Sequence, residues 1–143
     1  IEYVLVSGIW QYAYPIQDLI SGVWTNELGS YLDIYTSIDE EIANDLDYIV
    51  SPDHPSGEQY QTLLTSLETP ISGAHTLSYR YTKSGSGVIN LTVKLLEGVT
   101  EIASWTHSGV DGSWTTVDQG LTQEQIDLIN DYSNLSVIVE AFI

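Results

Sequence analysis

Residues 75–82 alternate strictly between hydrophobic or aromatic and polar side chains, and this pattern limits the fold more than any other. In "HTLSYRYT", His75, Leu77, Tyr79 and Tyr81 fall on one side of an extended chain and the polar residues on the other. A period of two residues is typical of a half-buried β-strand. The period recurs in "VINLTVKLLEG" after the loop "SGSG", and a turn leads into "TEIASWT". Residues 75–106 are therefore expected to form an antiparallel meander.

The composition extends this expectation to the whole chain. Ten Tyr, four Trp and many β-branched residues favour strands over helices, and 143 residues suffice for one domain with its own core. The fold class predicted is an all-β, antiparallel β-sandwich. "GSWTTVDQG" and "LSVIVEAFI" are expected to add strands, whereas "QYQTLLTSLE" fits a strand or a short helix and "SPDHPSGEQ" a loop.

One short helix is expected near residues 122–131. In "LTQEQIDLINDY", Thr122 stands at an N-cap position and Gln125 follows at the third helical position, which is the pattern of a capping box. Leu121 and Ile126 have the spacing of a hydrophobic staple around that cap. The helix is expected to pack on the sandwich and to connect two of its strands.

The sequence divides at Pro15, after an apolar and aromatic N-terminal segment. Residues 1–14 are predicted to be either an edge strand or an arm that adds a strand to a neighbouring copy, and residues 15–143 are predicted to form the sandwich. In both cases the large aromatic side chains would mediate oligomer contacts. The predicted contact residues are Tyr3, Trp10, Tyr12 and Tyr14.

Charge excludes several classes of partner. Arg80, Lys83 and Lys94 are the only basic residues beside twenty Asp and Glu, which gives a formal charge of −17. Nucleic acid and anionic membranes attract basic surfaces, so neither is expected as a partner. The chain has no Cys, which excludes disulfides and thiolate sites. It starts at Ile1 and contains no Met, which predicts a processed product or a fragment.

Catalytic patterns are not evident, and the protein is predicted not to be an enzyme. The histidines, His54, His75 and His107, stand outside any triad or zinc-spacing motif. A glycosidase needs two acids across a cleft, but in a chain with twenty acids some pair will meet that requirement by chance.

The segment "SIDEEIANDLDYIV" at 37–50 is unusually acidic. Hard cations bind carboxylates in turn-rich loops, so calcium is the one cofactor for which candidate ligands exist. The alternative is a solvated acidic edge, in which Asp45 and Asp47 face water and Tyr48 or Ile49 points inward. The candidate calcium ligands are Asp39, Glu40, Asp45 and Asp47.

Aromatic residues offer a second kind of candidate site, because exposed Trp and Tyr stack on sugar rings. The candidates for glycan binding are Trp24, Tyr31 and Tyr35. The alternative is core packing or subunit contact. Trp105 and Trp114, each within "SWT", are expected to face one core.

The order of these pieces resembles a small β-sandwich domain that recurs in virion proteins of tailed bacteriophages. The likeness covers about residues 15–141 and rests on the order and spacing of short elements. These elements are Trp24-Thr25 after Gly22, Ile38-Asp39-Glu40, Asp47-Tyr48-Ile49, Tyr79-Arg80-Tyr81, "SWTH", "SWTT", "LTQEQ" and "NDYSNLSVIV".

The resemblance implies a jelly-roll-like sandwich on the outside of a virion, as a capsid decoration protein or as a tail or fibre component. It implies a non-enzymatic structural role and carries no catalytic residues. The expected partners are other virion proteins, a host-surface glycan and further copies of the chain. The copies would form a homo-oligomer such as a trimer. The alternatives are a carbohydrate-binding module, with or without calcium, and a subunit of an extracellular filament joined by β-strand addition.

Overall fold

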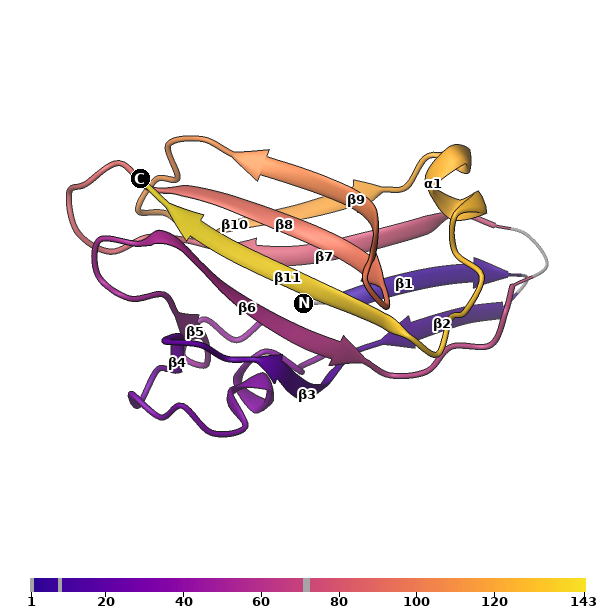
Figure 1. Ribbon diagram of the computed structural model, residues 1–143, viewed down its shortest axis with the longest axis horizontal. Coiled ribbons are helices and arrows are strands. Elements are labelled where there is room, and N and C mark those ends of the chain that lie inside the picture. Colours follow the sequence, from indigo (N-terminus) through magenta and orange to yellow (C-terminus); the bar gives the residue numbers. More distant parts are fainter. Residues whose placement is uncertain (1, 8, 71–72) are drawn as a thin grey trace.

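Two antiparallel β-sheets pack against each other, and a short helix lies at one end of them (Figure 1). The computed structural model describes residues 2–7, 9–70 and 73–143, and for residues 2–7, 9 and 10 it describes the backbone alone. The predicted antiparallel β-sandwich with one short helix is confirmed. Within the described residues, no helix has the length and apolar character needed to cross a membrane.

Sheet A has four strands and sheet B has five. In spatial order, sheet A consists of β10 (Thr115–Gly120), β7 (His75–Tyr81), β1 (Glu2–Ser7) and β2 (Ile9–Ala13). Sheet B consists of β3 (Pro15–Ile20), β6 (Ser56–Leu64), β11 (Leu135–Phe142), β8 (Asn90–Glu97) and β9 (Thr100–His107). Four edges result, formed by β10 and β2 in sheet A and by β3 and β9 in sheet B.

Three small elements complete the fold. The strands β4 (Thr25–Asn26) and β5 (Ile49–Val50) pair with each other, and the 3₁₀-helix η1 (Ile34–Ser37) lies between them in sequence. The helix α1 (Gln123–Asp127) is shorter than predicted. Its capping box is present as expected, because Thr122 Oγ1 accepts from the Gln125 amide and Gln125 Oε1 accepts from the Thr122 amide.

The strand order is that of a jelly roll with one exchanged strand. Taken in the order β2, β6, β7, β8, β9, β10 and β11, the chain visits sheets A, B, A, B, B, A and B in turn, as the first seven strands of a jelly roll do, and β3 is an additional edge strand of sheet B. The place of the eighth strand, between β2 and β7, is occupied by β1. β1 runs antiparallel to both neighbours, with Tyr3 opposite Ala13 on β2 and opposite Leu77 on β7.

Glu2–Ser7 and Ile9–Ala13 therefore form two strands, where the sequence predicted one strand or an arm over residues 1–14. β2 is an edge strand, as one of the two alternatives proposed, and β1 lies inside the sheet. Both pair within the same chain. The described residues of the N-terminal segment thus contribute two strands to sheet A.

The core lies between the sheets and follows the alternation of the strands. His75, Leu77 and Tyr79 of β7 are buried, as the pattern predicts, and they face residues such as Tyr60 and Val137 from sheet B. The expected turn after β8 contains Gly98 at φ 58°, a conformation that favours glycine. β6 begins at Ser56, so the segment predicted as the loop "SPDHPSGEQ" is a strand in its second half.

Asp18 on the edge strand β3 holds η1 against sheet B. Its Oδ2 accepts from the Ile34 amide and its Oδ1 from the Tyr35 amide, both at 2.9 Å, and Oδ1 also accepts from the Tyr60 hydroxyl at 2.6 Å. Burial, and then this hydrogen bond to Asp18, raise the pKa of Tyr60. One carboxylate thus joins β3, η1 and β6, and it fixes where the acidic segment 37–50 begins.

Candidate functional site

A cleft of about 1020 Å³ opens between loops at one end of the sandwich. These loops lie at the left-hand end in Figure 1. The acidic loop 37–55 and the loop that joins β7 to β8 form its rim, and the ends of β7, β8 and β11 form its inner wall. The inner wall is apolar, with Leu91, Val93, Val139 and Ala141, while the rim is polar. Ligand-binding pockets in proteins typically combine an apolar wall with a few placed polar groups.

An ion pair ties the acidic loop to sheet A at this cleft. Arg80 on β7 donates from Nε to Asp45 Oδ1 at 2.7 Å and from Nη2 to Asp45 Oδ2 at 2.8 Å. The guanidinium also donates to Thr116 Oγ1 on β10 at 2.9 Å. The Arg80 hydrogen bond holds the pKa of Asp45 below its usual range. A two-pronged contact of this kind orients both groups, so it fixes the loop as well as neutralising one charge.

Two aromatic rings stand beside this ion pair. The Arg80 guanidinium carbon lies 5.5 Å from the ring centroid of Trp114, a cation–π distance, and the Tyr48 ring lies 6.1 Å from Trp114 at an interplanar angle of 56°. Tyr48 and Trp114 both line the cleft. The expectation that Trp114 faces the core beside Trp105 is wrong, because Trp105 packs against the core from β9 and Trp114 packs on Arg80.

Two acids of the loop form a second cluster on the rim. Burial, and then a hydrogen bond to Asp47, raise the pKa of Glu40 to about 7. The charge of Asp39 acts in the same direction. Near neutral pH the Glu40 carboxyl therefore carries a proton part of the time, and it can then donate a hydrogen bond as well as accept one.

The four candidate calcium ligands do not converge on one point. Asp45 is engaged by Arg80, and within residues 2–7, 9–70 and 73–143 no three His, Asp or Glu side chains lie close enough to hold a metal ion. Glu40 and Asp47 do meet, but they meet as a hydrogen-bonded acid pair. The alternative interpretation of this segment, a solvated acidic edge, holds for Ile49, which packs against the core. It is wrong for Asp45 and Asp47, which are half-buried and bonded to Arg80 and Glu40 respectively.

The predicted glycan-binding residues do not form a common surface. Trp24 is buried, donates from Nε1 to the Glu58 carbonyl at 3.0 Å and packs on Tyr60, so its ring is part of the core edge. Tyr31 is exposed in the loop before η1, and Tyr35 lies within η1, half-buried. Neither Tyr31 nor Tyr35 lines the cleft.

Of the four predicted oligomer-contact residues, the structure describes the side chains of Tyr12 and Tyr14 only. The rings of Tyr12 and Tyr14 stack in parallel at 6.4 Å on the edge strand β2 and the residue after it, and Tyr12 is exposed. The side chains of Tyr3 and Trp10 lie outside the described residues, although their backbones pair within sheet A. An aromatic pair on an open strand edge remains consistent with an oligomer contact.

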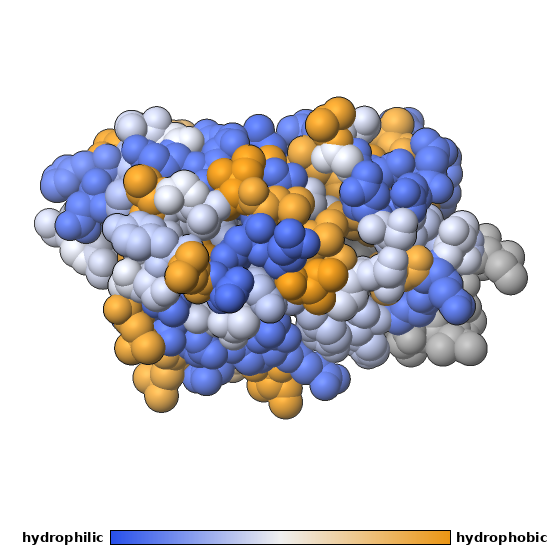
Figure 2. All heavy atoms as spheres, turned by 60° about the horizontal axis from the view of Figure 1, so that its bottom comes forward, coloured by the Kyte–Doolittle hydropathy of each residue, from blue (hydrophilic) through white to orange (hydrophobic). Residues whose placement is uncertain are grey.

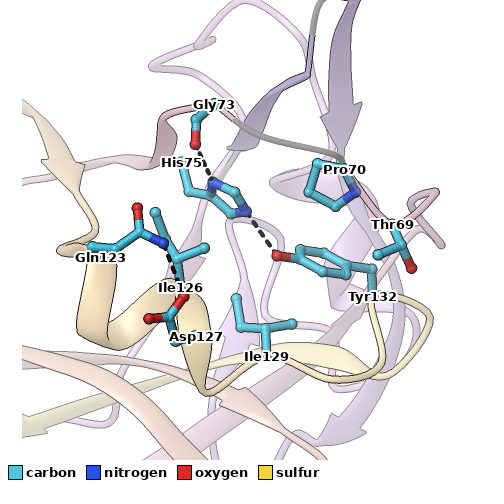
Figure 3. A pocket seen from close by; sticks show the side chains of 9 residues that line it. All are labelled: Thr69, Pro70, Gly73, His75, Gln123, Ile126, Asp127, Ile129 and Tyr132. Carbon is cyan, nitrogen blue, oxygen red and sulfur yellow. Dashed lines mark hydrogen bonds between the residues drawn. The ribbon is translucent and has the colours of Figure 1, made fainter.

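A smaller cavity of about 360 Å³ lies beneath α1, around the buried His75 (Figure 3). His75 Nδ1 lies 3.1 Å from the Gly73 carbonyl oxygen, and Nε2 lies 2.8 Å from the Tyr132 hydroxyl. Because a carbonyl only accepts, Nδ1 carries the proton and Tyr132 donates to Nε2. Burial lowers the pKa of His75, which favours this neutral form. Figure 3 shows the ring directed at these two partners, as in a structural histidine.

A third feature is an exposed apolar stretch at residues 16–32, on and beyond β3. Leu28 is 85% exposed and Leu32 is 81% exposed. Figure 2 brings this side of the molecule forward, and hydrophobic side chains are visible there among hydrophilic ones. The exposed large hydrophobic residues of the stretch are Ile16, Leu19, Ile20, Val23, Leu28, Tyr31 and Leu32.

Comparisons of the chain with protein-family models, with curated proteins and with solved structures return no match.

Proposed function

We propose that this chain is a non-enzymatic structural domain on the outside of a bacteriophage virion. The likeness of residues 15–141 to small virion β-sandwiches supports this role, and the jelly-roll order of the strands is the fold that the likeness implies. A decoration, tail or fibre protein of this kind acts through its surface contacts and needs no reacting groups.

The observation that carries the proposal is the apolar stretch 16–32. Monomeric proteins rarely leave extensive apolar surface exposed, and such surface commonly marks a contact with another protein. Seven large hydrophobic side chains of this stretch are exposed, and they belong to an edge strand and the loops that follow it. We assign this stretch as the surface by which the domain attaches to the particle.

Charge indicates what kind of protein covers the stretch. The stretch 16–32 contains two acids, Asp18 and Glu27, and no Lys or Arg, and the chain as a whole has a formal charge of −17. A second copy of the chain in contact here would set acids against acids, which disfavours assembly. The partner is therefore a different virion protein, with an apolar centre and a rim of Lys or Arg.

The charge of the remaining surface favours the exterior of the particle. Arg80 pairs with Asp45, Lys94 lies 3.8 Å from Glu101, and Lys83 donates to the Gly87 carbonyl, so the basic side chains are all engaged within the protein. Packaged DNA would be repelled by the acidic excess. An acidic surface that faces solvent instead keeps the particle soluble.

Homo-oligomerisation remains a prediction and would use a different surface. The open edge of β2 carries the exposed Tyr12, stacked on Tyr14, and an edge strand offers unpaired backbone groups to another copy. Trimers would follow if three copies met at this edge. The filament alternative requires more, because β1 would have to leave β7 and pair with the next copy.

Immunogold electron microscopy of intact particles tests the assignment. Antibody against the purified chain should label the outer surface of a particle at regular positions, and virions without label would overturn the proposal. The attachment surface is tested by the double substitution Leu28→Ser with Leu32→Ser, which should leave folding unchanged and prevent incorporation into the particle. The matched control is Val88→Ser with Val99→Ser, which changes two exposed apolar residues elsewhere and should incorporate normally.

A further inference from the structure

The cleft at the end of the sandwich has no role in the attachment described above. Its lining residues come mainly from the loop 37–55, β7, the loop after β7 and the inner ends of β8 and β11. The stretch 16–32 contributes only the buried Trp24 to it. Any ligand of the cleft would therefore bind at a surface that remains free when the domain is attached.

The rings of Tyr48 and Trp114 suit a ligand with small apolar faces. They stand at 56° to each other, with centroids 6.1 Å apart, and the Trp114 ring packs on Arg80, whose guanidinium is itself held by Asp45. Two rings held at an angle present a preformed aromatic corner, so little conformational entropy is lost when a ligand packs into it. Sugar rings, which have C–H faces between hydroxyl edges, match aromatic surfaces of this size.

The polar groups of the rim suit hydroxyl groups. Glu40, Asp47, Asp53 and Asp118 line the cleft, and their carboxyl oxygens accept hydrogen bonds, while Glu40 can also donate one when it is protonated. Hydroxyl groups of a neutral ligand can satisfy these acceptors. Phosphate, sulfate or carboxylate groups would meet like charge, because Arg80 and Lys83, the basic residues that line the cleft, are already engaged.

One buried hydroxyl group beside the cleft, that of Thr82, has no hydrogen-bond partner among the residues that the structure describes. Buried hydroxyl groups are nearly always bonded, so an isolated one in a pocket wall indicates a missing polar partner. A ligand hydroxyl group could supply it, after a rotation of the Thr82 side chain.

We propose that this cleft binds a neutral saccharide, with Tyr48 and Trp114 against the sugar rings and the rim carboxylates and Thr82 bonded to sugar hydroxyls. The site differs from the one that the sequence predicted, since Trp24, Tyr31 and Tyr35 contribute no exposed ring to it. The proposal stands whether or not the domain belongs to a virion, because it depends on the cleft alone.

A saccharide array probed with the full chain tests the proposal, followed by calorimetric titration of the best neutral ligand. The array should contain neutral, amino and acidic saccharides, and neutral ones should bind best. Trp114→Ala and Tyr48→Ala should each weaken binding about tenfold or more, as loss of an aromatic contact at a binding site commonly does. Tyr12→Ala, which removes an exposed ring from β2, should leave affinity unchanged.

Thr82→Val provides a variant that retains the shape of the side chain. It should weaken saccharide binding several-fold while leaving the melting temperature unchanged or slightly raised, because it removes a buried hydroxyl that has no partner. Binding of no neutral saccharide, stronger binding of acidic saccharides or of polylysine, or neutral-saccharide affinity unchanged by both aromatic substitutions would overturn the proposal. None of these outcomes bears on immunogold labelling of particles.

Discussion

Arg80 and Asp45 are 35 residues apart in sequence and form a two-pronged ion pair, with N–O distances of 2.7 and 2.8 Å. The pair joins the acidic loop to sheet A and places Tyr48 beside Trp114. Asp45→Asn should release the loop without unfolding the sandwich, because the core contacts of β7 do not depend on this pair. Amide hydrogen exchange over residues 42–48 should become several-fold faster.

Asp53→Asn is the matched control for that experiment. It removes one negative charge from the same rim, and Asp53 is exposed. Exchange over residues 42–48 should remain at the wild-type rate in this variant. Equal rates in Asp45→Asn and wild type would show that the loop is held by other contacts.

Glu40 should make stability depend on pH. Its pKa is about 7 in the folded protein against 4.5 when exposed, so the folded state retains a proton that the unfolded state has released. The contribution of Glu40 to the free energy of unfolding is therefore fully present below pH 4.5, and it is lost as the pH rises toward 7 and above. Glu40→Gln should remove this loss and raise the free energy of unfolding at pH 8 by about 1 kcal/mol, since the site is partly solvent-screened.

Urea denaturation at pH 5 and pH 8 measures this effect. Glu41→Gln, an exposed change of the same type at the next residue, controls for the loss of one charge. A gain at pH 8 of equal size in both variants would mean that general charge repulsion, and not the Glu40–Asp47 pair, is responsible.

Asp18 should be the most sensitive polar residue of the β3 edge. Asp18→Ala leaves the Ile34 and Tyr35 amides and the Tyr60 hydroxyl without their acceptor. The expected loss is about 3 kcal/mol, because hydrogen bonds to a charged group are among the stronger ones. Tyr60→Phe, which removes only one of the three bonds, should lose about 1 kcal/mol. Equal losses in the two variants would contradict the role of Asp18 in holding η1.

The helix cap gives a smaller and more local prediction. Thr122→Ala removes the side-chain oxygen that accepts from the Gln125 amide, and should cost about 1 kcal/mol in the free energy of unfolding. Thr122→Ser retains that oxygen and should stay within a few tenths of a kcal/mol of wild type. Guanidinium denaturation curves compare the three proteins, and an unchanged midpoint in Thr122→Ala would show that α1 does not contribute to stability.

Local patterns predicted the helix cap and several strands, but not how the strands pair. The antiparallel meander expected over residues 75–106 is wrong for its first strand, because β7 pairs with β1 and β10 in sheet A, whereas only β8 and β9 pair with each other in sheet B. The period of two residues in β7 places in the core the side chains that the structure buries, and the capping box is formed by the residues that predict it. In β8 the period holds for Val93 and Leu95, but Thr92 and Leu96 on the opposite side are buried as well.

Prolines and a glycine were misleading at 51–59, because β6 begins at Ser56 despite them. Pairing with β11 stabilises that strand, and no local signal reports it.

The cleft was not predictable in the same way, because its parts come from distant segments. Nothing in the sequence pairs Asp45 with Arg80 or brings Tyr48 to Trp114. One signal was nevertheless present, since Trp114 precedes Thr116 and Asp118 with the spacing of a strand and so shares their polar side. Because alternate residues of a strand point to the same side, Trp114 is expected to point outward with Thr116 and Asp118. Its hydrophobicity alone suggested that it lies in the core.

The central claim, that the stretch 16–32 attaches this domain to a virion, is tested most directly by a cryo-electron microscopy reconstruction of the particle. The account predicts that Ile16, Leu19, Leu28 and Leu32 are buried against a different, basic-rimmed virion protein while the cleft between Tyr48 and Asp118 opens to solvent. A reconstruction in which this stretch faces solvent and another surface makes the attachment would contradict it.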